Sequence, residues 1–302
     1  MPSVSYVIPV FNKSKFLKPV IDSLKSQKGD FQKEYIFIDD GSTDESYKIL
    51  IQETKDMNNC QILKQKNRGS ANATNQGIKR AKMKYIKFLD ADDLILSDST
   101  RLLVEILEKN SSCVLAYGLQ RKVNNIVNVN LNEKITNRDF KIIDNPIKLA
   151  MRNSMFNPSQ FLVKTSICKS VGGCDERVKF SQEYSLTLKL SKIGPFARLN
   201  YPIAILPFSA PGQISEKKNN QIFRVSKSLE LFVNENTDLP INIILYAQRR
   251  LTARAWRFAR NKKIKSLYLK YFFLYLIGLF RINIQPLKVC RLANKIYELF
   301  LD

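Results

Sequence analysis

The chain has no histidine among its 302 residues, and this absence narrows its possible chemistry. Catalysis by imidazole and metal ligation by histidine are excluded, so general-base work falls to a carboxylate or, as an alternative, to a lysine or tyrosine. The five cysteines are scattered, odd in number and without a Cys-x-x-Cys pair. This pattern argues against a zinc site and against a secreted disulfide scaffold, and it predicts a reducing, cytoplasmic location.

Several sequence segments with specialised functions are also missing. The first residues lack the charged-then-apolar build of a signal peptide, since an apolar strand pattern begins almost at Met1. The uncharged stretch Tyr271–Phe280 is about half as long as the roughly 20 apolar residues that a membrane-spanning helix needs. No glycine-rich loop follows the first predicted strand, which argues against a nucleotidyltransferase.

Acidic residues are scarce, and the charge is unevenly distributed. Lys and Arg number 49 against 27 Asp and Glu, and the segment from Leu245 to Asp302 holds thirteen basic residues and two acidic ones. This basic, aromatic tail suits an anionic membrane surface. A helical pair packed on the rest of the chain, with its cations solvated, is an equal alternative. Net charge alone suggests nucleic-acid binding, which the acidic clusters described next oppose because they would repel phosphate unless a metal intervened.

The most informative segment is Tyr85–Asp93, in which an apolar, strand-like run ends in three carboxylates within four positions. Like charges crowded in this way repel one another and suit a site that holds a cation. Oxygen ligands favour a hard divalent ion, Mg²⁺ or Mn²⁺, which could also carry a phosphate-bearing substrate. The alternative is a solvated acidic turn before the next helix.

A second acidic cluster follows another predicted strand. Residues 3–10 and 34–38 have strand character, and the second strand runs into Asp39 and Asp40. Since ligands of open α/β sheets bind outside the carboxyl ends of the strands, both acidic clusters are expected along one edge. The spacing Ser42-x-x-Glu45 predicts a capping box and a helix start.

Four motifs follow one another along the first third of the chain. They are Pro9–Val10–Phe11–Asn12, Asp39–Asp40–Gly41–Ser42–Thr43–Asp44, Asn67-x-Gly69 with Ala73-x-Asn75-x-Gly77, and Leu89–Asp90–Ala91–Asp92–Asp93. In this order they resemble the signature of family 2 glycosyltransferases. Such enzymes have the GT-A fold and invert the anomeric carbon as they move a sugar from a nucleotide-sugar. The resemblance is dense from Ser3 to about Asn110, weak through Ile214 and absent beyond.

The resemblance implies roles for individual residues. Asp40 would hydrogen-bond the nucleobase with Asp39 near the nucleoside, and Asp92 would bind the Mn²⁺ or Mg²⁺ that bridges the diphosphate, with Asp90 near the ribose or metal. Glu183 is the implied catalytic base. The residues implied in nucleotide-sugar binding are Pro9, Phe11, Asn12, Asp39, Asp40, Arg68, Gly69, Asn75, Asp90, Ala91 and Asp92.

Three departures from the family pattern bear on activity. The family's Glu–Asp pair is Gln182–Glu183 here, so the base keeps a carboxylate with one more methylene. The arginine often found near the diphosphate is replaced by Thr74, a charge that Arg68 or Lys66 could supply. The late histidine of the family is absent from residues 206–215, a loop expected to close over the donor without ligating metal.

The sequence therefore predicts an α/β fold of GT-A type, with a mostly parallel central sheet flanked by helices and a C-terminal helical, basic tail. We expect a nucleotide-sugar-binding half over 1–115, an acceptor-binding half over 116–220 and the helical extension over 221–302. The predicted function is an inverting, metal-dependent glycosyltransferase acting on a glycan or lipid-linked saccharide in bacterial surface polysaccharide synthesis. It would be cytoplasmic or peripheral on the inner membrane face and bind no nucleic acid. The alternative is a catalytically impaired relative that binds nucleotide-sugar or glycan.

Overall fold

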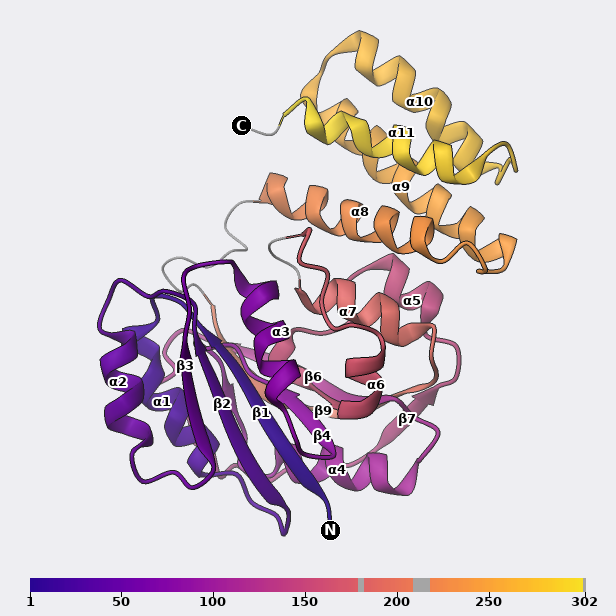
Figure 1. Cartoon of the computed structure of the whole chain (residues 1–302). Helices are drawn as coiled ribbons and strands as arrows, with labels where there is room; N and C mark the ends of the chain where they lie inside the picture. Colours follow the sequence, from indigo (N-terminus) through magenta and orange to yellow (C-terminus); the bar gives the residue numbers. More distant parts are fainter. Residues whose placement is uncertain (179–181, 209–217, 301–302) are drawn as a thin grey trace.

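The structure is a computed structural model that describes residues 1–178, 182–208 and 218–300 (Figure 1). The strands are β1 (Ser3–Val10), β2 (Gln32–Asp39), β3 (Cys60–Lys64), β4 (Tyr85–Phe88), β5 (Leu94–Ile95), β6 (Leu115–Val123), β7 (Phe140–Ile143), β8 (Phe161–Lys164) and β9 (Phe196–Pro207). The helices are α1 (Ser14–Lys25), α2 (Ser46–Thr54), α3 (Ser70–Arg80), α4 (Ser99–Lys109), α5 (Ile147–Arg152), the 3₁₀ helix η1 (Pro158–Gln160), α6 (Thr165–Ser170), α7 (Gln182–Ser191), α8 (Lys218–Glu235), α9 (Ile241–Lys262), α10 (Lys265–Leu279) and α11 (Pro286–Glu298).

All the strands belong to one sheet with the order β3-β2-β1-β4-β8-β6-β9-β5, and β7 pairs with β9. The first four strands in this order run parallel. β8 is antiparallel to both β4 and β6, whereas β6 and β9 are parallel. The parallel strands therefore end at one edge of the sheet, where the predicted ligand-binding loops begin.

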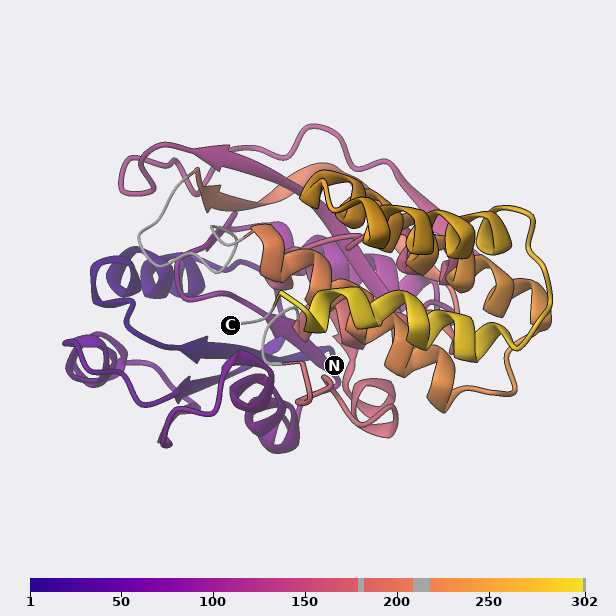
Figure 2. The same cartoon turned by 90° about the horizontal axis from the view of Figure 1, so that it is seen from above.

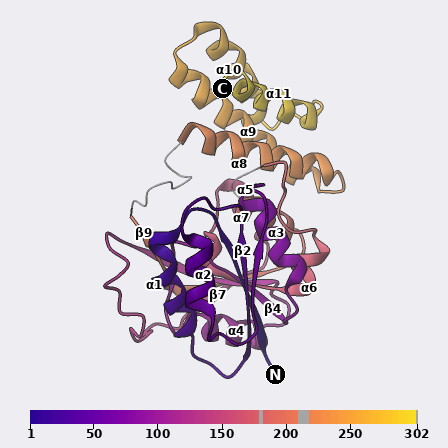
Figure 3. The same cartoon turned by 60° about the vertical axis from the view of Figure 1, so that its left-hand side comes forward.

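Both faces of the parallel strands are buried, which explains why β1 reads as a nearly continuous apolar run. Tyr6 and Ile8 belong to the hydrophobic cluster that α1 and α4 cover. Val7 points to the opposite face, into the cluster that contains residues of α3, α6 and α7. Figure 3 shows this three-layer arrangement, with α1 on one side of the sheet and α3 and α6 on the other.

The four C-terminal helices form a layer at one end of the sheet domain, next to α5 and α7 (Figures 1 and 2). They share a hydrophobic cluster with α5 and α7, which includes Met151 and Tyr184 together with residues of α8, α9, α10 and α11. Buried Arg254 of α9 donates to the backbone carbonyls of Met151 and Arg152 at the end of α5. The helices are thus fastened to the sheet domain by apolar packing and by hydrogen bonds.

The predicted α/β class, the sheet with flanking helices and the helical C-terminal segment are all present. The division into 1–115, 116–220 and 221–302 stays a prediction. Within residues 1–178, 182–208 and 218–300, no helix combines the length and apolarity needed to cross a bilayer. Of the loop 206–215, positions 209–215 lie outside the described residues.

One local prediction is wrong. The capping box at Ser42 does not form, because α2 begins at Ser46 and the Ser42 side chain accepts a hydrogen bond from the Asn12 backbone instead. The Ser42 amide donates to Asp39 Oδ1 at 3.2 Å. Long-range contacts across the sheet edge thus replace the local capping box, and the helix begins three residues later than predicted, with Glu45 at the N-cap position.

Candidate active site

The loops after β1, β2 and β4 leave the sheet side by side. Val10 pairs with Asp39, so β1 and β2 end level with each other, and β4 ends beside them at Phe88, which pairs with Val7. Asn12 connects two of the loops, since its Oδ1 accepts a hydrogen bond from the Thr43 amide at 2.8 Å. Asn12 adopts a φ of 51°, a left-handed conformation that Asn tolerates better than most residues.

The two carboxylates after β2 differ in how their hydrogen bonds are satisfied. Asp40 Oδ1 accepts from the Arg68 amide at 2.9 Å, and its Oδ2 accepts from the Gly69 amide at 2.8 Å. Gly69 has a φ of 90°, which favours glycine at the start of α3. Asp39 is fully buried, and its Oδ2 has no hydrogen-bond partner among the described residues. Asp40 thus orders the loop before α3, whereas Asp39 keeps a free acceptor.

Three carboxylates, those of Asp90, Asp92 and Asp93, crowd together directly after β4 in residues 90–93, the acidic loop. Burial, with repulsion from Asp92 and Glu183, raises the pKa of Asp90 to about 8. Burial, with repulsion from Asp90 and Asp92, raises the pKa of Asp93 well above its ordinary value. Ala91 is buried between them. Neighbouring carboxylates repel one another when all are ionised, so the acidic loop favours a bound cation.

Two cations from the chain partly offset this charge. Lys13 Nζ lies 2.6 Å from Asp92 Oδ2, and both side chains are less than one-fifth exposed. Lys87 is buried beneath the loop, donates to the Ser159 carbonyl, and has its pKa lowered to about 7 by burial. Neither Lys13 nor Lys87 was predicted from the sequence as a residue of the site. Lys13 directly follows the Pro9–Asn12 motif, and this position was the available signal.

Ser159 of η1 fixes the acidic loop from the opposite side. Its hydroxyl donates to Asp93 Oδ2 at 2.6 Å and accepts from the Asp90 amide at 3.1 Å. These contacts span 66 and 69 positions along the chain, so no local pattern indicates them. Ser159 therefore sets where the backbone of Asp90 and the side chain of Asp93 lie.

The predicted base lies next to the acidic loop. Glu183, in the first turn of α7, lines a small cavity together with Pro9 and Asp90. Ser154 Oγ lies 3.5 Å from Glu183 Oε1. Burial raises the pKa of Glu183 to about 7, the range in which a carboxylate can both hold and release a proton at neutral pH. The arrangement suits proton transfer.

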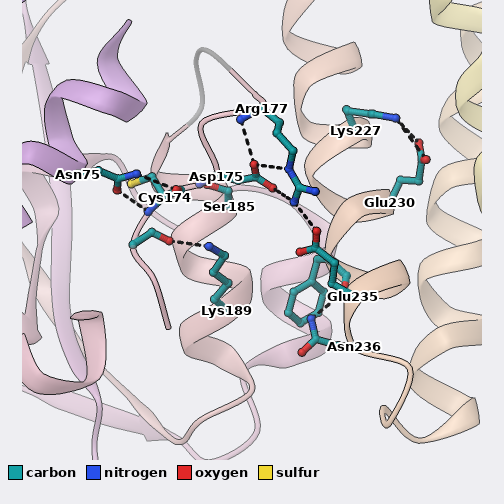
Figure 4. Close-up of polar contacts among 12 residues, drawn as sticks. Asn75, Cys174, Asp175, Arg177, Ser185, Lys189, Lys227, Glu230, Glu235 and Asn236 are labelled. Atoms are coloured by element: carbon teal, nitrogen blue, oxygen red, sulfur yellow. Dashed lines mark hydrogen bonds and ion pairs between the residues drawn. The ribbon is translucent and has the colours of Figure 1, made fainter. Parts of the chain in front are cut away.

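The turn before α7 is held by contacts from α3 and α8 (Figure 4). Asn75 of α3 accepts from the Cys174 amide at 2.8 Å and donates to the Cys174 carbonyl at 3.0 Å. Asp175 accepts a hydrogen bond from the Arg177 guanidinium, which also lies 2.5 Å from Glu235 of α8. The Asn75 amide, expected to contact nucleotide-sugar, is thus engaged with the turn in this structure.

The other predicted residues surround these groups. The Phe11 ring is 44% exposed at the sheet edge. Hydrogen bonds from Asn72 and Asn75, together with the positive charge of Arg68, lower the pKa of Glu176. Thr74 lines the same small cavity as Asp90 and Glu183. Pro9, Asp90 and Glu183 thus line one cavity, whereas Arg68 and Gly69 lie in the loop that Asp40 orders before α3.

The donor set fits a hard divalent ion that shares its ligands with a substrate. Asp90 and Asp92 offer carboxylate oxygens and repel each other, as the raised pKa of Asp90 shows. The described part of the chain contains no group of three or more acidic or sulfur side chains arranged as a metal cage. Mg²⁺ is commonly bound through one or two carboxylates plus substrate phosphates, so the absence of a cage is compatible with this ion.

Comparisons with known proteins agree with this geometry. Residues 5–171 match the sequence profile of Glycosyl transferase family 2. Chondroitin synthase of Escherichia coli is 27% identical over 203 residues, a match that covers 66% of this chain and only 28% of that protein. The chain thus spans less than a third of this relative's length.

Two solved structures share the fold. S. aureus TarS 1-349 in complex with UDP-GlcNAc has a TM-score of 0.69 at 16% identity, covering 99% of this chain and 92% of that one. Mannosyltransferase PcManGT from Pyrobaculum calidifontis, in complex with GDP-Man and Mn²⁺, has a TM-score of 0.58 at 15% identity, with coverages of 97% and 87%. The family match spans more than half of the chain and these folds agree with it, so the chain belongs to glycosyl transferase family 2.

Proposed function

We propose that the chain is an inverting, divalent-metal-dependent glycosyltransferase that moves a sugar from a nucleoside diphosphate sugar to a hydroxyl of a glycan or lipid-linked saccharide. The observation that carries this proposal is the cavity shared by Glu183 and Asp90, in which Glu183 has a pKa of about 7. The S. aureus TarS and PcManGT structures, with UDP-GlcNAc and GDP-Man bound, support a nucleotide-sugar as donor. The match to chondroitin synthase supports polysaccharide synthesis as the process, and we assign it to a bacterial cell surface.

The reaction would be a single displacement. Glu183 accepts the proton of the acceptor hydroxyl as that oxygen bonds to the anomeric carbon. The bond from this carbon to the diphosphate breaks on the opposite side, and its electron pair leaves with the diphosphate. Attack opposite to the leaving group inverts the anomeric centre. A base placed within hydrogen-bond reach of the hydroxyl typically contributes about 10²–10⁴-fold to the rate.

Donor binding would use the loops at the sheet edge. Asp40 would hydrogen-bond the nucleobase while it keeps the loop before α3 in place, and Asp39, whose Oδ2 has no partner among the described residues, would lie near the nucleoside. Asp90 and Asp92 would hold the divalent ion, and Lys13 would have to release Asp92 or share it. When bound, such an ion offsets negative charge on the departing diphosphate.

A catalytically impaired relative that binds donor or glycan is the second candidate. It is favoured by the Lys13–Asp92 ion pair, which occupies the carboxylate expected to bind metal. Thr74 and Gln182 in place of the family's charged residues favour it too.

One experiment separates the two candidates. The full chain would be incubated with UDP-GlcNAc, GDP-mannose or UDP-glucose and Mn²⁺, with release of nucleoside diphosphate as the measure of turnover and EDTA as the control. Thermal shift with each nucleoside diphosphate measures binding, because a ligand at about a hundredfold its Kd stabilises by about 2.7 kcal/mol. Metal-dependent release supports the enzyme, stabilisation without release supports the impaired relative, and the absence of both refutes the two together.

We also propose that α10 meets an anionic membrane surface. Its outward side exposes Leu269 and Phe273 at 46% and 63%, and Phe280, directly after the helix, is 70% exposed. Spacings of four and seven residues place these three side chains on one stripe of the helix. The exposed cations Lys270 and Arg281 flank the stripe. Apolar side chains bordered by cations suit the headgroup region of anionic lipid.

A further inference from the structure

A groove of about 630 Å³ lies between the sheet and the end of α5. Its floor is formed by β6, β7 and β9, and its wall by the residues that follow α5. The residues that matter for its chemistry are Tyr117, Lys141, Arg152, Ser154, Gln160 and Arg198.

The groove adjoins the proposed active site at two points. Ser154 lines the groove and lies 3.5 Å from Glu183 Oε1. Gln160 also lines it and is the last residue of η1, whose Ser159 holds the acidic loop. A molecule in this groove could therefore extend a hydroxyl towards Glu183 while the rest of it lies along the sheet.

The charge in the groove has one sign. Lys141, Arg152 and Arg198 line it, and its lining contains no aspartate or glutamate. Among the ion pairs of the described residues, none includes these three cations. A cleft lined by one sign of charge concentrates counter-ions.

The strand pairing makes this arrangement costly for the fold. Lys141 of β7 lies directly opposite Arg198 of β9, and like charges in that position destabilise a sheet. Tyr117 of β6 lies opposite Arg198 on the other side; burial raises the pKa of its phenol, and the positive charge of Arg198 partly offsets that rise. Three neighbouring strands thus present a row of Tyr, Arg and Lys to one groove. Local rules broken without compensation are typical of functional sites.

Apolar surface accompanies the cations. The groove is also lined by Ile142 and Leu149, whose side chains are 39% and 43% exposed. Tyr117 contributes an aromatic side chain to the same lining. Apolar and aromatic side chains with a few placed polar groups are the usual lining of a ligand site.

We propose that this groove binds the acceptor through an anionic group, a phosphodiester or a carboxylate carried by the acceptor saccharide. The proposal rests on the proposed function, since it identifies the bound molecule as the acceptor of Glu183. Lys141, Arg152 and Arg198 pair with the anion, and the apolar lining contacts the rest of the molecule.

Direct binding tests the proposal without requiring turnover. The full chain would be titrated by calorimetry with a galacturonate octamer, a glycerol-phosphate octamer and the neutral maltooctaose. At least one anionic probe should bind about tenfold or more tightly than the neutral one, because a charge pair near a protein surface is worth more than a neutral contact. The preference should shrink as salt rises. Comparison of the two anionic probes tells carboxylate from phosphodiester.

A charge-matched control accompanies the key variant. Lys141→Gln, Arg152→Gln and Arg198→Gln together should remove the anionic preference while circular dichroism and stabilisation by UDP with Mn²⁺ stay unchanged. The control replaces three exposed lysines outside the groove with glutamine and should keep the preference; these are Lys55, Lys109 and Lys148.

The outcomes of these titrations distinguish failure of the groove assignment from failure of the proposed function. Equal affinity for anionic and neutral probes, or an equal loss in the control variant, would overturn the groove assignment and leave the proposed function standing. Groove-dependent anion binding in a chain that neither binds nor turns over donor would overturn the acceptor role and the proposed function. That result would leave an anion-binding groove.

Discussion

The change Glu183→Gln tests the proposed base through activity and stability at the same time. The substitution keeps the size and hydrogen-bonding capacity of the side chain and removes its basicity. We expect transfer to fall by about 10²–10⁴-fold while donor binding stays near the wild-type level. Turnover of the wild type should rise with pH up to about 7 and level off above it, because the pKa of Glu183 is raised to about 7.

Glu183→Gln is expected to raise the free energy of unfolding at neutral and higher pH, although it lowers the rate of transfer. Burial raises the folded-state pKa of Glu183 from its ordinary 4.5, so the native state binds this proton more tightly than the unfolded chain does. The free energy of unfolding therefore falls as pH rises from about 4.5 to about 7. At 1.36 kcal/mol per pKa unit the loss is at most about 3 kcal/mol. Glu183→Gln should remove it and be more stable than wild type at pH 8, with no such gain at pH 4.

A purely structural role predicts the reverse. A carboxylate in the first turn of α7 would favour the helix by about 0.3–1 kcal/mol, so the variant would be less stable at pH 8 and fully active. Urea unfolding at pH 4 and pH 8, with a transfer assay on the same samples, distinguishes the two roles. Glu105→Gln, in a partly buried i,i+4 ion pair of α4 outside the site, is the control and should leave turnover unchanged. Wild-type turnover in Glu183→Gln, or lower stability at pH 8, would refute the base assignment and direct attention to other carboxylates.

Three further predictions concern the metal, the membrane and the core. Asp92→Asn should abolish the Mn²⁺ dependence of nucleoside diphosphate binding in a thermal-shift assay while the fold is kept, and an unchanged metal dependence would show that another residue is the ligand. Phe273→Ser with Phe280→Ser should weaken co-sedimentation with phosphatidylserine vesicles without loss of solubility or donor binding; undiminished sedimentation would exclude this stripe as the contact. Gly77→Ala should lower the free energy of unfolding by about 1–3 kcal/mol in urea, because the added Cβ would lie 2.3 Å from Val7 Cγ1, and wild-type stability would mean that α3 shifts freely on β1.

Much of the parallel half of the fold could be predicted because its signals are local. The apolar runs that became β1 and β4 end in polar loop residues, and strands buried on both faces give such runs. The acidic clusters were placed along one sheet edge from strand polarity alone. The polar segment after Tyr117 was harder to predict. β6 continues to Val123 through exposed polar residues because it pairs with β9 there, a partner more than 70 positions away.

The candidate site was only partly predictable for the same reason. Glu183 and Asp92 stand within motifs, so the sequence could nominate them. Lys13 and Ser159 gain their importance from contacts with Asp92 and Asp93 that span 79 and 66 positions, and a single sequence carries no local trace of such contacts. The groove cations were equally hidden, since Lys141 and Arg198 become neighbours only through the pairing of β7 with β9.

The packing of the C-terminal helices on α5 and α7 limits where related chains can be recombined. Their apolar cluster includes Met151 and Tyr184, and Arg177, in the turn before α7, reaches Glu235 of α8. A crossover placed just before α8 would divide this shared core between two parents, so Arg254 and Glu235 would meet an α5 end and a turn before α7 that come from the other parent. A chimera that exchanges the helices should keep its fold only if α5 and α7 are exchanged as well. The proposed base on α7 and the groove wall after α5 would then be inherited with the helices, so new acceptor preferences and new membrane-facing surfaces would enter such chains together.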